Sequence, residues 1–327
     1  FDENGEIREL YDKSADRQVL RGRGNVLSAH VDRGGYFESW NITPDAERKV
    51  FILKEVDEMS LVEDGPVRKT LRIRKRFRHS VIDQHISIYE KLPRIDFRTK
   101  ADFREQQMLL KAGFQVDVDA PAATYDISMG NIKRPTTRNT SFEKAMFEVC
   151  MHKFMDLSSD DYGVAILNDC KYGGDVCGNR MRISLIKTST FPDENQDIGL
   201  HEFCYSLYPH KGDVRQGRVR EMAYQLNQPL CPLAGALELP PAPISCEDSG
   251  IVLETLKMAE QEDAVILRLY EHYGQEREIH IGWRLPVSAV SRCDVLEQET
   301  KALVRLEGQD ISLRIKPCEI VTLKIML

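Results

Sequence analysis

Apolar and polar residues alternate along much of the chain, which is typical of strands buried on one face only. Residues 67–78 are the clearest case, because arginine occupies every second position from Arg72 to Arg78. Short turns separate such runs, so the pattern predicts antiparallel sheets packed on one face. The positions expected to face the core are Leu71, Ile73 and Phe77, with Ile86 and Ile88 in the similar run 81–90.

Two segments leave the choice between helix and strand open. Residues 103–111 could form a short helix. Residues 140–150 have a helix-friendly composition but also fit a strand with Phe147 and Val149 on one face, and we favour the strand. Helix signals are scarce elsewhere, so the chain predicts an all-β fold.

A proline-rich stretch, residues 228–245, marks the clearest boundary in the chain. Proline has no amide donor and a restricted φ, which excludes a central strand there. We expect an extended linker between a large antiparallel β-sandwich over residues 1–227 and a small β-sandwich over residues 246–327.

The charge balance narrows the classes of partner. The 327 residues include 45 basic and 52 acidic side chains, a formal net charge of −7. An acidic chain is a poor ligand for a phosphate backbone, so we expect no nucleic acid and interpret the basic positions of 67–78 as a solvated sheet face. No apolar run approaches the roughly 20 residues that cross a bilayer, so we expect no membrane partner.

Self-contained catalytic and metal motifs are absent from the sequence. It has no Walker A loop, GxGxxG, HExxH or GxSxG pattern, and its eight histidines are dispersed. Eight cysteines are scattered without a CxxC pair, so we expect no metal site here. We interpret the cysteines as reduced side chains of a cytoplasmic protein.

The densest candidate chemistry follows a buried strand. The apolar residues 164–167 lead into Asn168, Asp169, Lys171 and Tyr172, and two glycines then permit a sharp turn. An amide, a carboxylate, an ammonium and a phenol suit the recognition of sugar hydroxyls, each of which donates and accepts hydrogen bonds. A structural Asn-Asp turn with a lysine salt bridge explains the same residues equally well.

An aromatic cluster is the second candidate. Trp40 lies in the run 35–42 (GYFESWNI), where aromatic and polar residues are mixed. Aromatic faces can pack on the C–H face of a pyranose ring, although an ordinary sandwich core has the same residues.

Several strings occur in a distinctive order: 134–141 (RPTTRNTS), then 147–149 (FEV), 167–173 (LNDCKYG) and the tail 316–323 (KPCEIVTL). Together they resemble the C-terminal half of glycoside hydrolase family 38 α-mannosidases, in the branch of the cytosolic and bacterial enzymes. The sequence departs from that pattern at a few positions, which bear on substrate detail. Phe142 and Phe154 stand where the family usually has Trp, Thr137 where His is usual, and 38–41 (ESWN) is a weakened form of the family's DAWD segment.

The resemblance implies a galactose-mutarotase-like supersandwich followed by a small β-sandwich. It also implies retaining hydrolysis of terminal α-linked mannose, with the nucleophile and a divalent metal, zinc, in an N-terminal catalytic domain. Since the chain opens at Phe1 without a leader, we expect a fragment without that domain and hence no catalytic residue here. Its partners would be a mannose-containing oligosaccharide and its own catalytic domain, and a homo-oligomer stays open.

On this hypothesis the β half walls one side of the active-site cleft and adds sugar contacts. The residues we expect to make them are Asn168, Asp169, Lys171, Tyr172, Trp40 and Arg134. A stand-alone carbohydrate-binding or structural β module is the alternative. A complete glycosidase using Asp169 and Glu202 is a third, but nothing in the sequence places these carboxylates opposite each other. A fragment should also expose one apolar docking face.

Overall fold

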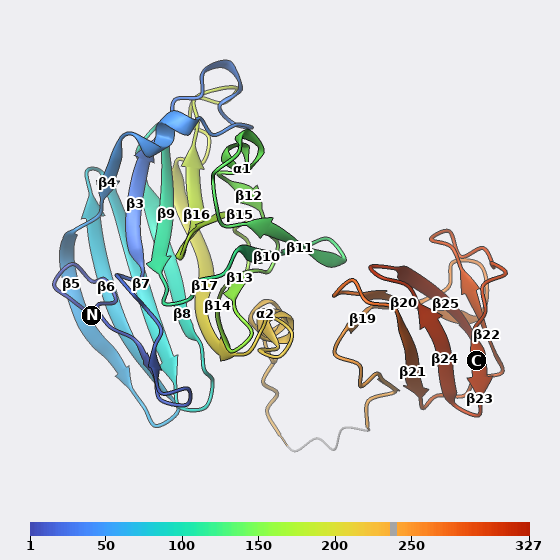
Figure 1. Ribbon diagram of the computed structural model, residues 1–327. Helices are drawn as coiled ribbons and strands as arrows, with labels where there is room; N and C mark the ends of the chain where they lie inside the picture. The colour runs from blue at the N-terminus through green and yellow to red at the C-terminus, as the bar shows by residue number, and fades with distance from the viewer. Residues whose placement is uncertain (236–240) are drawn as a thin grey trace. The chain divides into compact units, whose positions relative to one another are not determined.

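The structure is a computed structural model and describes residues 1–235 and 241–327 (Figure 1). It consists mainly of antiparallel strands and divides into two compact units. The large unit holds residues 1–126 and 132–230, and the small unit holds residues 127–131 and 231–327. The division after residue 230 falls inside the predicted linker 228–245, of which residues 236–240 lie outside the described residues.

The large unit is a sandwich of two sheets. The nine-stranded sheet has the order β11-β10-β13-β14-β17-β8-β7-β6-β5. Its strands are β5 (Glu55–Asp64), β6 (Arg68–Phe77), β7 (Ser80–Tyr89), β8 (Ile95–Phe103), β10 (Ala122–Ile127), β11 (Gly130–Pro135), β13 (Phe154–Ser158), β14 (Tyr162–Asn168) and β17 (Gly199–Lys211).

The six-stranded sheet has the order β12-β15-β16-β9-β3-β4. Its strands are β3 (Val26–Val31), β4 (Val50–Ile52), β9 (Met108–Gln115), β12 (Val149–Cys150), β15 (Gly173–Cys177) and β16 (Arg180–Thr188). Apolar side chains from both sheets form one core, in which Phe97, Phe114 and Tyr205 lie in ring contact. The predicted all-β fold with a large antiparallel sandwich is therefore confirmed.

Short elements complete the large unit. A small hairpin joins β1 (Tyr11–Asp12) to β2 (Arg17–Gln18). Two single turns of 3-10 helix, η1 (Gly35–Phe37) and η2 (Pro44–Glu47), lie between β3 and β4, and the α-helices are α1 (Ser141–Ala145) and α2 (Val219–Asn227).

The small unit is a second sandwich with its own core, which includes Trp283, Leu267 and Leu323. Two four-stranded sheets enclose it, with the orders β18-β21-β24-β23 and β19-β20-β25-β22. Their strands are β18 (Ile244–Ser245), β19 (Ile251–Met258), β20 (Ala264–Glu271), β21 (Arg277–Trp283), β22 (Ala289–Cys293), β23 (Arg305–Glu307), β24 (Asp310–Ile315) and β25 (Ile320–Met326). This confirms the predicted small C-terminal β-sandwich.

One local prediction is wrong, and one alternative that the sequence left open does not occur. The short helix considered for 103–111 does not form, because β8 continues to Phe103 and β9 starts at Met108. The strand favoured for 140–150 is mainly replaced by α1. A capping box begins that helix, since the Thr140 hydroxyl accepts the Glu143 amide and the Glu143 carboxylate accepts the Thr140 amide.

Ile73 and Ile86 are buried as expected, but Ile88 is not covered by the core. Ile88 shares the inner face with Ile86, but it is 48% exposed near the end of β7. Met59 and Leu61 on the edge strand β5 are exposed as well. The nine-stranded sheet is wider than the six-stranded sheet opposite it, and this corner of its apolar face stays uncovered.

The basic face of β6 is a network of surface ion pairs. Arg72 contacts Asp83 on β7 and Glu58 on β5, and Arg76 contacts Asp57 on β5. Acidic neighbours on both adjacent strands therefore neutralise the arginines, which supports the prediction of a solvated sheet face.

Candidate functional site

The residues after β14 form a turn that crosses from the nine-stranded to the six-stranded sheet; we call residues 168–173 the β14–β15 turn. Asn168 is fully buried there. Its amide donates to the His152 carbonyl at 2.7 Å, and its Oδ1 accepts the Lys171 amide at 2.7 Å. Both ends of the Asn168 side chain thus hold the turn itself.

Asp169 also acts within the protein, because its carboxylate accepts the Cys204 amide at 3.0 Å. This bond extends the pairing of the turn with β17. Burial raises the pKa of the neighbouring Cys204 thiol to about 12, so that group stays protonated near neutral pH. Glu202 pairs instead with Lys100 at 3.6 Å on the exposed face.

Lys171 and Tyr172, later in the turn, present their side chains differently. The Lys171 ammonium lies 4.7 Å from the centroid of the Phe203 ring, a cation–π contact. Tyr172 is 54% exposed, and its ring lies edge-on to His152 at 5.8 Å. The β14–β15 turn therefore offers one aromatic surface to solvent, whereas Asn168 and Asp169 hold it in place.

Arg134 lies away from this turn, on β11. Its Nη1 is 3.6 Å from the Met146 sulfur, and its buried Nε has no hydrogen-bond partner among the described residues. Across residues 1–235 and 241–327, no hydrogen bond, ion pair or ring contact joins Arg134 or Trp40 to the β14–β15 turn. The structure thus brings together four of the six predicted residues and leaves two apart.

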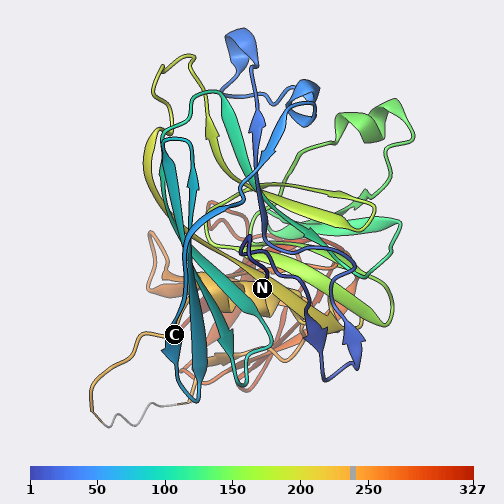
Figure 2. The same ribbon diagram turned by 90° about the vertical axis from the view of Figure 1, so that its left-hand side faces the viewer.

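Trp40 belongs to a separate group of rings that we call the aromatic platform: Tyr36, Phe37 and Trp40 from the loop before β4, and Phe191 from the loop after β16. Tyr36 and Phe191 have ring centroids 4.8 Å apart, and Phe37 lies 5.9 Å from Tyr36 and 6.5 Å from Trp40. Figures 1 and 2 show both loops at the same end of the large unit.

Strand register explains why these distant segments meet. Val31 on β3 and Thr188 on β16 both pair with Met108 on the central strand β9. The loops that follow β3 and β16 therefore leave the sheet at one end, on either side of the segment that enters β9. Phe191 is 155 positions from Tyr36 in the sequence, so no local pattern could have placed it in this cluster.

A buried carboxylate lies beneath the platform. Glu38 is 1% exposed, and it accepts hydrogen bonds from the Thr190 amide and hydroxyl and from the Gln107 side chain. Burial opposes ionisation of Glu38, but these donors outweigh it and hold the pKa of the carboxyl below its usual value. The Glu38 carboxylate thereby ties the platform loop to the segments before β9 and after β16.

A second buried carboxylate, Asp32, holds the ends of the same loop. It forms an ion pair with Lys187 on β16, and its Oδ1 accepts the Thr43 amide at 3.2 Å. Gly35 has a φ of +68°, a conformation that side chains disfavour. The loop is thus a tight turn fixed at its ends and its middle.

Behind both loops lies a buried charge network that sequence reasoning missed. Arg182 on β16 contacts Asp175 on β15 at 3.0 Å and Glu47 of η2 at 2.8 Å. Lys111 on β9 contacts Asp175 at 3.0 Å and also Glu148. Burial opposes ionisation of Asp175, but Lys111 and Arg182 outweigh it and hold its pKa below the usual value. Single charged residues inside apolar strands, such as Lys111, were the available signal.

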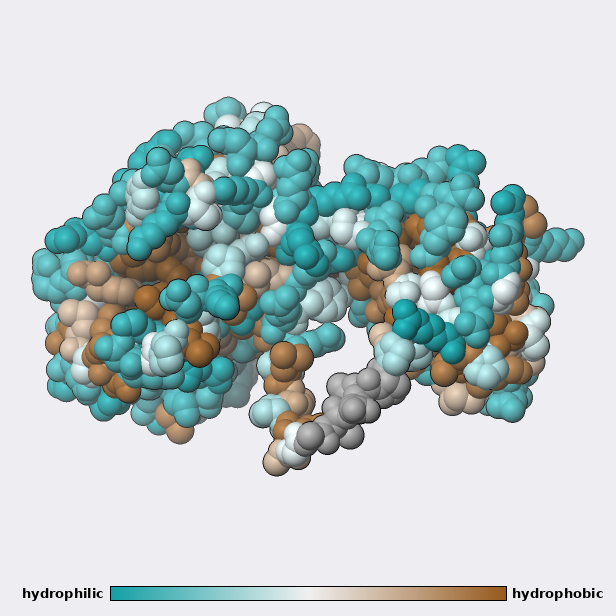
Figure 3. All heavy atoms as spheres, turned by 90° about the horizontal axis from the view of Figure 1, so that it is seen from below, coloured by the Kyte–Doolittle hydropathy of each residue, from teal (hydrophilic) through white to brown (hydrophobic). Residues whose placement is uncertain are grey.

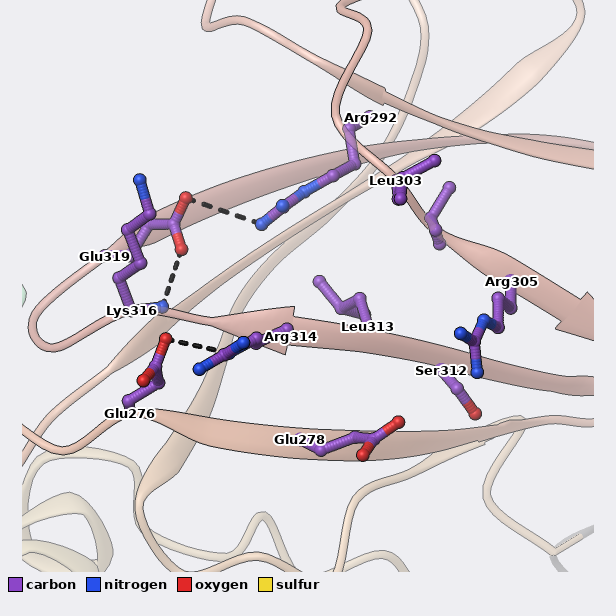
Figure 4. A pocket seen from close by; sticks show the side chains of 11 residues that line it. Glu276, Glu278, Arg292, Leu303, Arg305, Ser312, Leu313, Arg314, Lys316 and Glu319 are labelled. Atoms are coloured by element: carbon purple, nitrogen blue, oxygen red, sulfur yellow. Dashed lines mark hydrogen bonds and ion pairs between the residues drawn. The ribbon is translucent and has the colours of Figure 1, made fainter.

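The small unit carries a groove of its own, with a volume of about 530 Å³ (Figure 4). Arg314 pairs with Glu276 at 2.8 Å and Arg292 with Glu319 at 3.5 Å along its walls. Two of its arginines are thus paired with glutamates, and none of the six predicted site residues lies in this groove.

The described residues contain neither a group of metal ligands nor a membrane-spanning helix. Within residues 1–235 and 241–327, no three His, Cys, Asp or Glu side chains are grouped so that they could hold a metal ion. In the same residues, no helix is long and apolar enough to span a bilayer.

Exposed apolar side chains occur outside the platform as well. Figure 3 views the opposite end of the large unit, where brown patches interrupt a mainly teal surface. The largest exposed fractions among apolar side chains of this unit include 80% for Phe142 and 83% for Leu200, and Val67 is 72% exposed. The surface is thus not free of apolar residues, and the apolar docking face expected of a fragment stays a prediction.

Comparisons with known proteins show which family the chain is similar to. The family model "Glycosyl hydrolases family 38 C-terminal domain" matches residues 1–195, and "Glycosyl hydrolases family 38 C-terminal beta sandwich domain" matches residues 250–323. The chain is 31% identical over 338 residues to α-mannosidase G of Dictyostelium discoideum, covering 98% of this chain and 31% of that protein. It is 33% identical over 317 residues to α-mannosidase 2C1 of Mus musculus, covering 93% and 30%.

Solved structures give the same fold. An α-mannosidase from Enterococcus faecalis V583 matches with a TM-score of 0.80 at 15% identity, over 100% of this chain and 41% of that one. The chain therefore spans about a third of the length of the curated relatives it matches.

Proposed function

Because this chain belongs to glycosyl hydrolase family 38, we propose that it forms the C-terminal β portion of an α-mannosidase that hydrolyses terminal α-linked mannose. The observation that carries the proposal is the nearly end-to-end match, 98% of this chain, to one third of an α-mannosidase. The substrate is then a mannose-containing oligosaccharide.

The chemistry is divided between two parts of the protein in this proposal. A retaining mechanism needs two carboxyl groups about 5 Å apart across the glycosidic bond. We assign the nucleophile and a divalent metal such as zinc to the catalytic portion, outside this chain. The portion described here supports that domain, walls one side of the cleft and contacts sugar.

Exposed side chains are the best candidates for the sugar contacts. Tyr172 and Trp40 are 54% and 70% exposed, so their ring faces are accessible to a pyranose. Asn168 and Asp169 support the loop that carries Tyr172. Eight free cysteines, several of them exposed, support our proposal of a reducing, cytoplasmic location.

The test is hydrolysis of an aryl α-mannoside with zinc or cobalt supplied. We expect no turnover by this chain alone, and turnover by a polypeptide that joins it to the family's catalytic portion. Turnover by the chain alone would overturn the division of labour. An inactive joined polypeptide that is folded by circular dichroism would overturn the assignment as an α-mannosidase.

A further inference from the structure

The aromatic platform is unusual for its exposure. Tyr36, Phe37 and Trp40 are 76%, 65% and 70% exposed, and Phe191 is 37% exposed. Large rings are normally buried in a sandwich, because each one removes a large apolar area from water. Several exposed rings in mutual contact on two loops therefore indicate a surface that binds something.

The platform is also held rigidly. Glu38, at the centre of the loop, accepts three hydrogen bonds from Thr190 and Gln107. The Ser39 hydroxyl lies within hydrogen-bond distance of both the Phe191 carbonyl and the Gln196 side-chain oxygen, so its single proton is shared between them and links the two ring-bearing loops. A surface whose rings are fixed before binding loses little conformational entropy when a ligand arrives.

Polar groups frame the rings. Arg33 and Asn41 flank the loop and are exposed, and no hydrogen bond or ion pair occupies either side chain within residues 1–235 and 241–327. A guanidinium group donates in a planar fork, and an amide both donates and accepts. These groups match adjacent sugar hydroxyls, whereas the rings match the C–H face of the same sugar.

We propose that the aromatic platform binds one hexopyranose unit of a mannose-containing oligosaccharide, with Trp40 and Tyr36 against its C–H face and Arg33 and Asn41 on its hydroxyls. The choice of mannose rests on the proposed function. The rings are tilted against one another by 35° to 70°, so they form a ridge with polar flanks.

The chain contains its own reporter for this site. It has two tryptophans, and Trp283 is 1% exposed in the core of the small unit. Trp283→Phe therefore leaves Trp40 as the only tryptophan, whose emission is excited selectively at wavelengths that tyrosine does not absorb. We expect α-1,3-mannobiose to shift and quench its emission in a saturable way, with a Kd of about 1 mM. If Trp283→Phe does not fold, the unaltered chain serves, because the buried Trp283 contributes a constant background.

Matched variants show whether the platform is responsible for the binding of mannobiose. Tyr36→Ala and Phe191→Ala should each weaken mannobiose binding at least ten-fold. Phe142→Ala removes an equally exposed aromatic ring from α1, outside the platform, and should leave binding unchanged. Loss of binding in Phe142→Ala to the same extent would overturn the assignment to the platform.

The remaining outcomes separate this inference from the proposed function. No change in Trp40 emission up to the solubility of mannobiose, in a folded chain, overturns the platform as a sugar site. A shift that follows protein concentration instead of sugar overturns it too, in favour of a self-association surface. A response to maltotriose but not mannobiose supports a pyranose site and contradicts mannose. Mannobiose binding beside a joined polypeptide that is folded but inactive supports the platform and overturns the proposed enzyme.

Discussion

The β14–β15 turn and the aromatic platform contain similar residue types but use them in opposite ways. In the turn, Asn168 and Asp169 make hydrogen bonds to the backbone nearby, and Tyr172 is the exposed ring. In the platform, Glu38 makes comparable bonds to segments distant in sequence, and three rings around it face solvent. Polar residues that look ready to bind a ligand can thus hold a loop, while the rings beside them are left accessible.

The charge network behind the two loops connects them. Arg182 binds Asp175, two residues after the β14–β15 turn, and Glu47, which follows the platform loop. Both loops therefore lead into chain segments that are fixed to the same strand, β16. Substitutions at the charge network, at Glu38 and at Asn168 test which loop depends on which of these contacts.

The largest effect is expected at the network. Asp175→Ala leaves Lys111 and Arg182 without a shared carboxylate in a buried position, so we expect a loss of about 3 to 5 kcal/mol in the free energy of unfolding. Urea denaturation followed by circular dichroism measures it. Asp83→Ala breaks the surface pair with Arg72 and serves as the control, with a loss below about 1 kcal/mol. Equal losses would contradict the importance of burial.

Glu38→Ala should have the next largest effect on the free energy of unfolding. It removes an acceptor from Thr190 and Gln107, and we expect a loss of about 2 to 4 kcal/mol because the hydrogen bonds involve a buried charge. Trp40 should also become more mobile, seen as lower fluorescence anisotropy in a Trp283→Phe background. Unchanged anisotropy would show that the platform does not depend on Glu38.

Buried lysines allow the cost of burying a charge to be tested by changing the pH. Lys111 has two carboxylate partners, whereas Lys75 is 1% exposed and donates to the Leu53 carbonyl at 3.1 Å. Burial lowers the pKa of Lys75 to about 8, although Glu6 and Asp2 oppose this shift. Between that value and about 10.5, the unfolded chain keeps a proton that the native protein has lost, so this group adds stability as pH rises.

The measurement is the unfolding free energy of the unaltered chain minus that of Lys75→Met. We expect this difference to rise by about 2 to 3 kcal/mol between pH 7 and pH 10. A difference that stays constant over this range would show that Lys75 titrates normally.

Asn168→Ala should lower the free energy of unfolding by about 1 to 3 kcal/mol, because the His152 carbonyl and the Lys171 amide lose their partner. The platform should not respond, since its anchors lie elsewhere. Thermal unfolding measures the loss of stability, and Trp40 emission reports whether the conformation of the platform has changed. A changed Trp40 spectrum would mean that the two loops are coupled.

The smallest effect is expected for the exposed rings. Trp40→Ala and Tyr172→Ala should each change the unfolding free energy by less than about 0.5 kcal/mol, because most of each side chain already faces water. Chemical denaturation followed by circular dichroism measures both. A loss above about 1 kcal/mol in either variant would assign that ring to the fold instead of to binding.

Much of the fold could be predicted from residue order. Alternation placed Ile73 and Ile86 inside because side chains of a strand point to opposite faces in turn. The Thr140–Glu143 capping box was present in the sequence, and α1 shows that it outweighed the strand pattern. Ile88 could not be predicted in this way, because its exposure depends on the width of the opposite sheet.

The candidate site also has a part that could be predicted from the sequence and a part that could not. The residue order alone was enough to predict the two sandwiches, the family and the bond from the Lys171 amide to Asn168, because each depends on neighbouring residues or on an ordered string of them. Only the tertiary structure brought Phe191 to Tyr36, Thr190 to Glu38 and Asp175 to Lys111. Those contacts follow from the pairing of β3 and β16 with β9, and of β15 with β16, and such pairing is set by the register of whole sheets.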